Sequence, residues 1–201
     1  MGIKKIALVG GPCAGKTTIL SAIREEFADQ TIFVPEVATL LLEGGFPIPG
    51  THLPWSEKWQ SAFQSAVLPL QQALEDTNEL VAEAKGRNLI ICDRGLLDGA
   101  AYTPGGVAEF CRRYNLNYEK ALANYTAIIH LESLATSDPQ KYGKRGNASR
   151  FETVERAREI ELAVREAWKG HPRYIFVGGK KDVSSKISEV VGMVRFLLSE
   201  K

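Results

Sequence analysis

The sequence has 201 residues, enough for one α/β domain with a full hydrophobic core. Its formal net charge of +1, with 44% apolar and 24% charged residues, is ordinary for a globular protein. This balance gives no reason to expect a specific nucleic acid as the main partner. Three cysteines, Cys13, Cys92 and Cys111, are too few and too scattered for a disulfide framework or a zinc site, and the odd number fits a reducing cytoplasm.

The N-terminal segment lacks the marks of two common targeting signals. Its apolar run stops at Gly10, short of the roughly 7–15 apolar residues of a secretory signal. Ile6 stands where the myristoylation motif has Ser or Thr. No run approaches the ~20 apolar residues of a transmembrane helix. We therefore expect a soluble, cytoplasmic protein, whose oligomeric state the sequence does not give.

The hydrophobic pattern alternates between short apolar runs, which predict buried strands, and apolar residues at three- and four-residue spacing, which predict helices. In chain order it predicts a strand at 3–9, a helix at 17–27, a strand at 31–34, a helix at 56–85 with a bend at Pro69, a strand at 88–92, helices at 107–114 and 118–124, a strand at 125–131, a loop at 133–150, a helix at 151–168, a strand at 173–177 and a helix at 183–197. Continuous apolar strands separated by helices imply a parallel sheet covered on both faces. We expect a three-layer α/β fold with five parallel strands, in a single domain over residues 1–201.

The clearest motif lies between the first predicted strand and the first predicted helix, where residues 10–17 match G-x-x-x-x-G-K-[ST] in full. Glycines let the backbone turn its N–H groups inward around phosphates, and the helix presents its positive end to them. Lysine can then reach the β and γ phosphates, and threonine offers a hydroxyl to Mg²⁺. The predicted binding residues are Gly10, Gly11, Pro12, Cys13, Ala14, Gly15, Lys16, Thr17 and Thr18. This motif predicts a P-loop NTPase that binds the phosphates of ATP or GTP with Mg²⁺.

Acidic residues follow the second and third predicted strands, at the edge of the sheet where ligands bind in open parallel sheets. Asp93 suits an acid that holds Mg²⁺ through water, and Arg94 can clamp an anionic or hydroxyl-bearing substrate. Glu36 can accept a proton from an attacking hydroxyl. The alternative for all three is helix capping. The sequence leaves open whether Glu36 or Asp93 is the base.

The predicted loop at 133–150 is basic and occupies the place of a lid in P-loop phosphotransferases. Lys141, Lys144, Arg145 and Arg150 lie within ten residues of one another. Such cations can close on a transferring phosphoryl group, and Arg145 and Arg150 are favoured because arginine binds phosphate with two hydrogen bonds. A solvated loop and a site for an anionic lipid headgroup are the alternatives.

A second candidate nucleotide-binding segment follows the fifth predicted strand. Gly179, Lys180 and Asp182 belong to the sequence GGKKD at 178–182, where related folds place the base. Guanine-specific proteins use N-K-x-D at this point, and the Asn is missing here. We therefore expect ATP, with GTP as the alternative.

Several stretches together resemble one known family. They are residues 10–18, FVPEVA at 33–38 with GG at 44–45, CDRG at 92–95, NASRFE at 147–152 and HPRY at 171–174. The chain resembles the AAA-type P-loop ATPase group that includes NadR-like nicotinamide riboside kinases and the TRP-channel translocation-defect protein. The resemblance implies a P-loop kinase-like fold that binds nucleotide with magnesium. The Pro35-Glu36 pair is also similar to deoxynucleoside kinases, in which the matching Glu is the base for a sugar hydroxyl, and Asp93-Arg94 resembles a pair in thymidylate and related kinases.

Two functions fit these observations. The first is a small-molecule kinase that transfers the γ-phosphoryl group of ATP to a hydroxyl of a nucleoside-like acceptor. The second is a GTP- or ATP-dependent switch that binds a phosphoinositide or a protein partner through the basic loop. A kinase should lose turnover when Glu36 becomes Gln, whereas a switch should tolerate that change.

Overall fold

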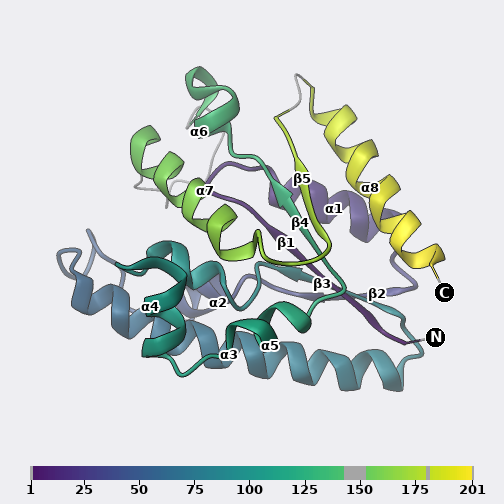
Figure 1. Ribbon diagram of the computed structural model, residues 1–201, viewed down its shortest axis with the longest axis horizontal. Coiled ribbons are helices and arrows are strands. Elements are labelled where there is room, and N and C mark those ends of the chain that lie inside the picture. The colour runs from purple at the N-terminus through teal and green to yellow at the C-terminus, as the bar shows by residue number, and fades with distance from the viewer. Residues whose placement is uncertain (1, 143–152, 180–181, 201) are drawn as a thin grey trace.

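The computed structural model describes residues 2–142, 153–179 and 182–200. The strands are β1 (Lys4–Val9), β2 (Thr31–Val34), β3 (Leu89–Asp93), β4 (Ala127–Leu131) and β5 (Tyr174–Val177). The helices are α1 (Lys16–Glu26), α2 (Val37–Glu43), α3 (Glu57–Ala84), α4 (Gly106–Arg113), α5 (Tyr118–Ala123), α6 (Leu134–Ser137), α7 (Val154–Trp168) and α8 (Val183–Ser199), with short 3₁₀ helices η1 (Asp98–Tyr102) and η2 (Pro139–Lys141). Figure 1 shows their arrangement around the sheet.

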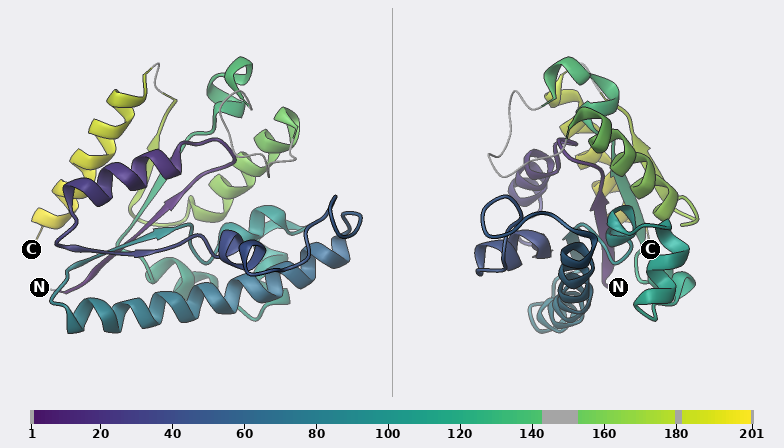
Figure 2. Two further views of the ribbon diagram at one scale, coloured as in Figure 1. Left: turned by 180° about the vertical axis from the view of Figure 1, so that it is seen from behind. Right: turned by 90° about the vertical axis from the view of Figure 1, so that its left-hand side faces the viewer.

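The five strands form one sheet in the order β2-β3-β1-β4-β5, and every neighbouring pair is parallel. Successive residues of β1 point to opposite faces, so Ile6 and Leu8 join one core cluster and Ala7 and Val9 join the other. The first cluster packs under α1 and α8, and the second under α3, α4, α5 and α7. Figure 2 shows helices on both sides of the sheet. The predicted three-layer α/β fold is confirmed.

A buried polar group connects α3 to the middle of the sheet. The Glu75 carboxylate accepts hydrogen bonds from Gln71 (2.7 Å), Tyr125 (2.7 Å) and Asn124 (2.8 Å), and Lys5 lies 3.4 Å away. A buried carboxylate is tolerated only with such partners. Gln71 also donates to the carbonyl of Arg94 at 3.4 Å. The hydrogen bonds around Glu75 therefore connect α3 to the residue that follows β3.

Two stretches differ from the sequence-based prediction. Residues 37–43, for which no element was predicted, form the seven-residue helix α2. Only Val37 of this helix is buried, so the sequence lacks the apolar periodicity by which a helix is predicted. The prediction of a loop over 133–150 was wrong at its start, because α6 and η2 occupy residues 134–141. Ser133 caps α6 by accepting from the N–H of Ala135 at 3.1 Å, which explains why so short a polar helix forms.

The long predicted helix over 56–85 is α3, which continues through Pro69. Ser56 begins it as the N-cap, accepting from the Trp59 N–H at 3.1 Å. Trp55 precedes this helix and is 61% exposed.

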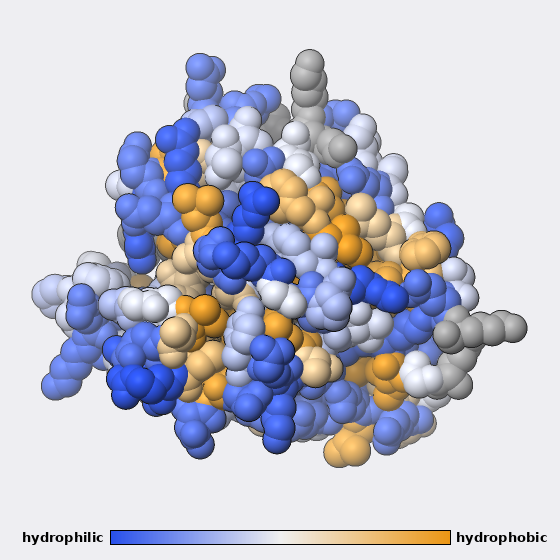
Figure 3. All heavy atoms as spheres, in the orientation of Figure 1, coloured by the Kyte–Doolittle hydropathy of each residue, from blue (hydrophilic) through white to orange (hydrophobic). Residues whose placement is uncertain are grey.

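The edge strand β5 and helix α8 border an apolar groove of about 440 Å³. Its lining includes Ile175, Gly192, Met193, Phe196 and Leu197. Figure 3 shows apolar side chains gathered over β5 and α8 on this face of the molecule. Within the ranges that the structure describes, no helix is long and apolar enough to cross a membrane.

A substitution at Gly95 tests the packing at the end of β3. A Cβ there would lie 2.8 Å from Trp168 Cζ2 and 2.9 Å from the Tyr125 hydroxyl, and both rings are held in the core. We expect Gly95→Ala to lower the free energy of unfolding by about 1–3 kcal/mol, measured by urea denaturation.

The matched control is Gly192→Ala on α8. A Cβ there would have no described atom within 4 Å, so this change should be neutral or stabilise by up to ~1 kcal/mol through helix propensity. Equal effects of the two substitutions would contradict this packing.

Candidate functional site

The loop between β1 and α1 has the backbone that its glycines predict. Gly10 has φ 142° and Gly15 has φ 88°, and Cys13 is one of the few non-glycine residues with positive φ, at 59°. Gly15 is the N-cap of α1 and has no side chain to cap it, so the N–H groups of Lys16, Thr17 and Thr18 are available to a ligand. This is the arrangement of an anion site at a helix N-terminus.

The outer side of this loop is held by other parts of the chain. The carbonyls of Pro12, Cys13 and Ala14 all accept hydrogen bonds. Their donors are, in the same order, the Ser133 hydroxyl, the Leu134 N–H (3.3 Å) and the Lys186 ammonium (3.0 Å). Because its carbonyls point outward to these partners, the loop can direct its N–H groups inward.

Lys16 lies inside the loop with only 8% of its surface exposed. Its ammonium donates to the carbonyl of Gly10 at 3.2 Å. Burial, and then the nearby Arg94 guanidinium, lowers the pKa of Lys16 to about 8. A phosphate group beside it would stabilise the charged ammonium, so this lysine can contribute favourably to the binding of an anion.

The structure brings Glu36, Asp93 and Arg94 to the same edge of the sheet as the loop. Arg94 Nε lies 2.5 Å from Glu36 Oε1, and Arg94 Nη1 donates to Asp98 Oδ1 at 3.3 Å and to the Gly10 carbonyl at 3.4 Å. Arg94 itself has φ 75°, a left-handed conformation that is rare for this residue type. The arginine therefore connects the acidic residues with the phosphate loop.

Asp98 was not among the predicted site residues. It is buried, accepts from the Gly95 N–H at 3.1 Å and from Trp168 Nε1 at 3.0 Å, and contacts Arg94 through its other oxygen. It thus fixes the direction of the arginine side chain. The signal in the sequence was an aspartate three residues after a glycine at a strand end, which favours a turn.

Asp93 and Thr17 offer oxygen atoms of the kind that Mg²⁺ binds. Asp93 Oδ1 is buried and has no hydrogen-bond partner among the described residues, and burial raises the pKa of this carboxyl, an effect that the Lys16 ammonium opposes. Thr17 is exposed in the first turn of α1. An unsatisfied buried carboxylate oxygen beside a phosphate loop fits an ion that binds largely through water and nucleotide phosphates. Among the described residues, no group of three or more His, Cys, Asp or Glu could hold a metal by itself.

Glu36 is partly exposed and carries two interactions. Besides Arg94, it accepts from the Thr39 hydroxyl at 2.7 Å. The Arg94 guanidinium is the main reason that the pKa of Glu36 is lowered to about 2. This side chain is therefore a carboxylate at neutral pH, able to accept a hydrogen bond from a hydroxyl.

The remaining predicted site residues have other neighbours or are not described. Asp182 caps α8, accepting from the Ser185 N–H and hydroxyl, both at 2.7 Å. Gly179 donates its N–H to Glu132. Lys141 pairs with Asp138 at 2.6 Å. The other predicted residues of the lid and the base site, Lys144, Arg145, Arg150 and Lys180, lie outside the described residues.

A family model described as an AAA domain matches residues 5–186 of the sequence. The chain belongs to this AAA-domain family. The solved structure of deoxyadenosine kinase from M. mycoides with bound dATP is similar to it in fold, with a TM-score of 0.54 and 17% sequence identity over 95% of this chain and 99% of that chain. No curated protein matches the chain. The resemblance to nicotinamide riboside kinases and the TRP-channel translocation-defect protein stays a prediction.

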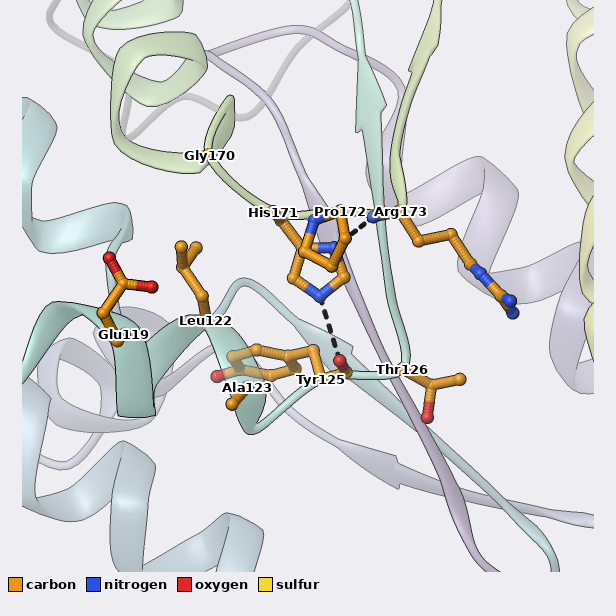
Figure 4. Close-up of a pocket in the computed structure, with 9 residues that line it drawn as sticks. All are labelled: Glu119, Leu122, Ala123, Tyr125, Thr126, Gly170, His171, Pro172 and Arg173. Atoms are coloured by element: carbon orange, nitrogen blue, oxygen red, sulfur yellow. Dashed lines mark hydrogen bonds between the residues drawn. The ribbon is translucent and has the colours of Figure 1, made fainter.

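A cavity of about 600 Å³ lies away from the phosphate loop. It is lined by residues that precede β4 and β5, at the opposite edge of the sheet, as Figure 4 shows. His171 donates from Nε2 to the Tyr125 carbonyl (2.9 Å) and accepts the Arg173 N–H at Nδ1 (3.0 Å). Nε2 thus joins the segment before β5 to the segment before β4, and Nδ1 stabilises the turn of its own segment, which gives the HPRY stretch a structural role.

The ion pair between Glu36 and Arg94 predicts a pH-dependent stability. The pKa of Glu36 is lower in the folded chain than its ordinary value of 4.5, so the pair stabilises the fold above pH 4.5 and its contribution is lost as the pH falls towards 2. We expect Glu36→Gln to lower the free energy of unfolding by about 1–3 kcal/mol at pH 7, measured by urea denaturation.

The difference between wild type and Glu36→Gln should shrink steadily between pH 5 and pH 3. Glu43→Gln, an exposed position at the other end of α2, is the control. A difference for Glu36→Gln that stays constant over this pH range would argue against the pair.

Proposed function

We propose that this protein is a magnesium-dependent, ATP-binding phosphotransferase that moves the γ-phosphoryl group to a hydroxyl of a nucleoside-like acceptor. One observation carries the proposal: Arg94 contacts both the Glu36 carboxylate and the Gly10 carbonyl of the phosphate loop. The Arg94 guanidinium thus lies between the Glu36 carboxylate, which would bind the acceptor, and the loop that would bind the donor phosphates. Phosphoryl transfer needs chiefly this positioning, together with charge stabilisation.

On the nucleotide side, the loop of residues 10–18 holds the phosphates through its inward N–H groups. Lys16 neutralises charge on the β and γ phosphates. Thr17 would hold Mg²⁺ directly and Asp93 through water, and the ion would neutralise charge on the phosphate oxygens. The adenine is favoured over guanine because Asp182 uses its carboxylate to cap α8.

On the acceptor side, we propose that the acceptor hydroxyl donates its hydrogen bond to Glu36 rather than to Asp93. Glu36 is the more accessible carboxylate and already accepts a hydroxyl hydrogen bond from Thr39. Its low pKa is compatible with this role, because the transition state of phosphoryl transfer is loose and the hydroxyl proton is lost late. Arg94, held by Asp98, then faces the group in transfer.

A nucleoside-like acceptor is supported by the side chains at the start of α3. Gln64 is 5% exposed, and its Oε1 is buried without a hydrogen-bond partner in the part of the chain that the structure describes. The residue before it, Phe63, stacks on Trp59 with centroids 5.0 Å apart, and Phe46 meets both rings edge-on. Aromatic rings and a buried amide on the same turn of a helix suit a planar heterocycle with polar edges. The deoxyadenosine kinase fold agrees with this class of acceptor.

We also propose that Arg145 and Arg150 act as lid cations. They lie between η2 and α7 in the sequence, and α7 contacts the phosphate loop through Glu161, which accepts from the Gly11 N–H. Arginine on a lid can bind the transferring phosphoryl group with two hydrogen bonds and exclude water.

The test is ATP consumption with Mg²⁺ against a panel of nucleosides, nucleotides and pyridine ribosides, with Lys16→Ala as the blank. We expect at least one acceptor to raise turnover well above the unstimulated rate. Glu36→Gln should then lower kcat by about 10²-fold or more, because the acceptor hydroxyl loses its carboxylate.

Nucleotide affinity should change less than about threefold in Glu36→Gln, since Glu36 lies on the acceptor side of Arg94. If no acceptor stimulates turnover while ATP or GTP still binds tightly, the kinase proposal fails. A nucleotide-dependent switch then becomes the better account, and binding to anionic vesicles would be measured.

A further inference from the structure

A buried chain of polar side chains reaches the phosphate loop from its outer side. Glu161, on α7, is only 4% exposed, and its Oε2 accepts from the N–H of Gly11 at 2.7 Å. Its Oε1 lies 2.7 Å from His130 Nε2 on β4. The other ring nitrogen of His130 lies 2.6 Å from the Tyr174 hydroxyl on β5. None of Glu161, His130 and Tyr174 belongs to the site described above.

The carboxylate fixes the direction of its hydrogen bond with His130. A carboxylate accepts only, so His130 Nε2 carries the proton and donates to Glu161. In the neutral ring Nδ1 then accepts, and the Tyr174 hydroxyl donates to it. The buried carboxylate thus has donors on both oxygens, which is what burial of such a group requires.

The Gly11 N–H and the Gly10 carbonyl belong to one peptide unit, whose two groups point in opposite directions. The carbonyl of this unit accepts from Lys16 Nζ at 3.2 Å and from Arg94 Nη1 at 3.4 Å. Glu161 therefore holds one side of the peptide, and the two cations of the site bind to the other.

This peptide needs an external partner to keep its orientation. It joins two glycines, for which a rotation of the peptide plane meets little steric resistance. The approach of α7 is also close: a Cβ on Gly11 would lie 2.7 Å from Glu161 Oε2 and 3.3 Å from Glu161 Cα. A turned peptide would direct its N–H at Lys16 and Arg94 and remove their acceptor.

We propose that Glu161 is a positioning residue of the nucleotide site, which orients the Gly10–Gly11 peptide so that its carbonyl holds Lys16 and Arg94. His130 and Tyr174 hold the carboxylate in place. This role rests on the nucleotide binding that the proposed function assigns to residues 10–18. It concerns a contact and not a charge, because a negative charge by itself near the phosphates would weaken nucleotide binding.

Two substitutions separate the contact from the charge. Glu161→Asp keeps the charge, but its side chain is one methylene shorter and does not reach the Gly11 N–H. Glu161→Gln keeps the contact without the charge, because its amide oxygen accepts from the Gly11 N–H. Its NH₂ group donates to His130 Nε2 if the ring takes the other tautomer, in which Nδ1 carries the proton and donates to the Tyr174 hydroxyl oxygen. Glu159→Ala, an exposed position on the same helix, is the control.

The experiment is a fluorescence titration of each full-length variant with mant-ATP and Mg²⁺, together with the midpoint of thermal unfolding. We expect Glu161→Asp to weaken binding about tenfold, and Glu161→Gln and Glu159→Ala to stay within about threefold of wild type. Folded Glu161→Asp with wild-type affinity would overturn the proposal, as would an equal loss in Glu161→Asp and Glu161→Gln. If Glu161→Asp does not fold, Tyr174→Phe replaces it, with an expected loss of about fivefold; a change of less than about threefold would then overturn the proposal.

The wild-type titration reports the proposed function separately. Binding by the wild type with no effect of Glu161→Asp defeats this inference alone. No binding by the wild type defeats nucleotide binding, and this inference with it.

Discussion

The orientation of the backbone between β1 and α1 is the constraint on which the rest of the site depends. A loop can offer N–H groups to phosphates only if its own carbonyls find partners elsewhere, because buried backbone groups must be paired. Here the partners of the carbonyls come from two later parts of the chain, the turn after β4 and helix α8, while Glu161 on helix α7 accepts from the Gly11 N–H. The parallel sheet brings these parts to one edge, so the fold itself completes the loop.

The same edge also sets the acceptor half of the site. Arg94 adopts a left-handed conformation at the end of β3, which points its side chain back across the sheet towards Glu36 and Gly10. Helix α7 touches both halves, through Glu161 at the phosphate loop and through Trp168, which holds Asp98. These two residues are seven positions apart, about 10 Å along one helix face. A single rigid helix thus fixes the spacing between the loop and the arginine.

Much of this could be predicted from local sequence patterns. The apolar runs identified five strands to within about two residues, and the Gly-Lys-Thr motif located the loop and the start of α1. The clustering of Glu36, Asp93 and Arg94 followed from their positions after parallel strands. These features depend on residues close together in the sequence or on the general geometry of parallel sheets.

The supporting contacts could not be predicted in the same way, because each joins residues far apart in the chain. Glu161 meets Gly11 across 150 positions, and Trp168 meets Asp98 across 70. A signal for Glu161 existed: it is a charged residue between Ile160 and Val164 on the apolar face of α7. A charge at such a position indicates a buried partner but does not identify it.

The most direct test of this account is a crystal structure of the protein with Mg²⁺ and a non-hydrolysable ATP analogue. The account predicts the β and γ phosphates on the N–H groups of Lys16, Thr17 and Thr18, with Mg²⁺ bound by Thr17 and facing Asp93. It also predicts that the Gly10 carbonyl still points towards Arg94. Phosphates bound elsewhere, or a Gly10–Gly11 peptide turned away from Glu161 in the complex, would contradict it.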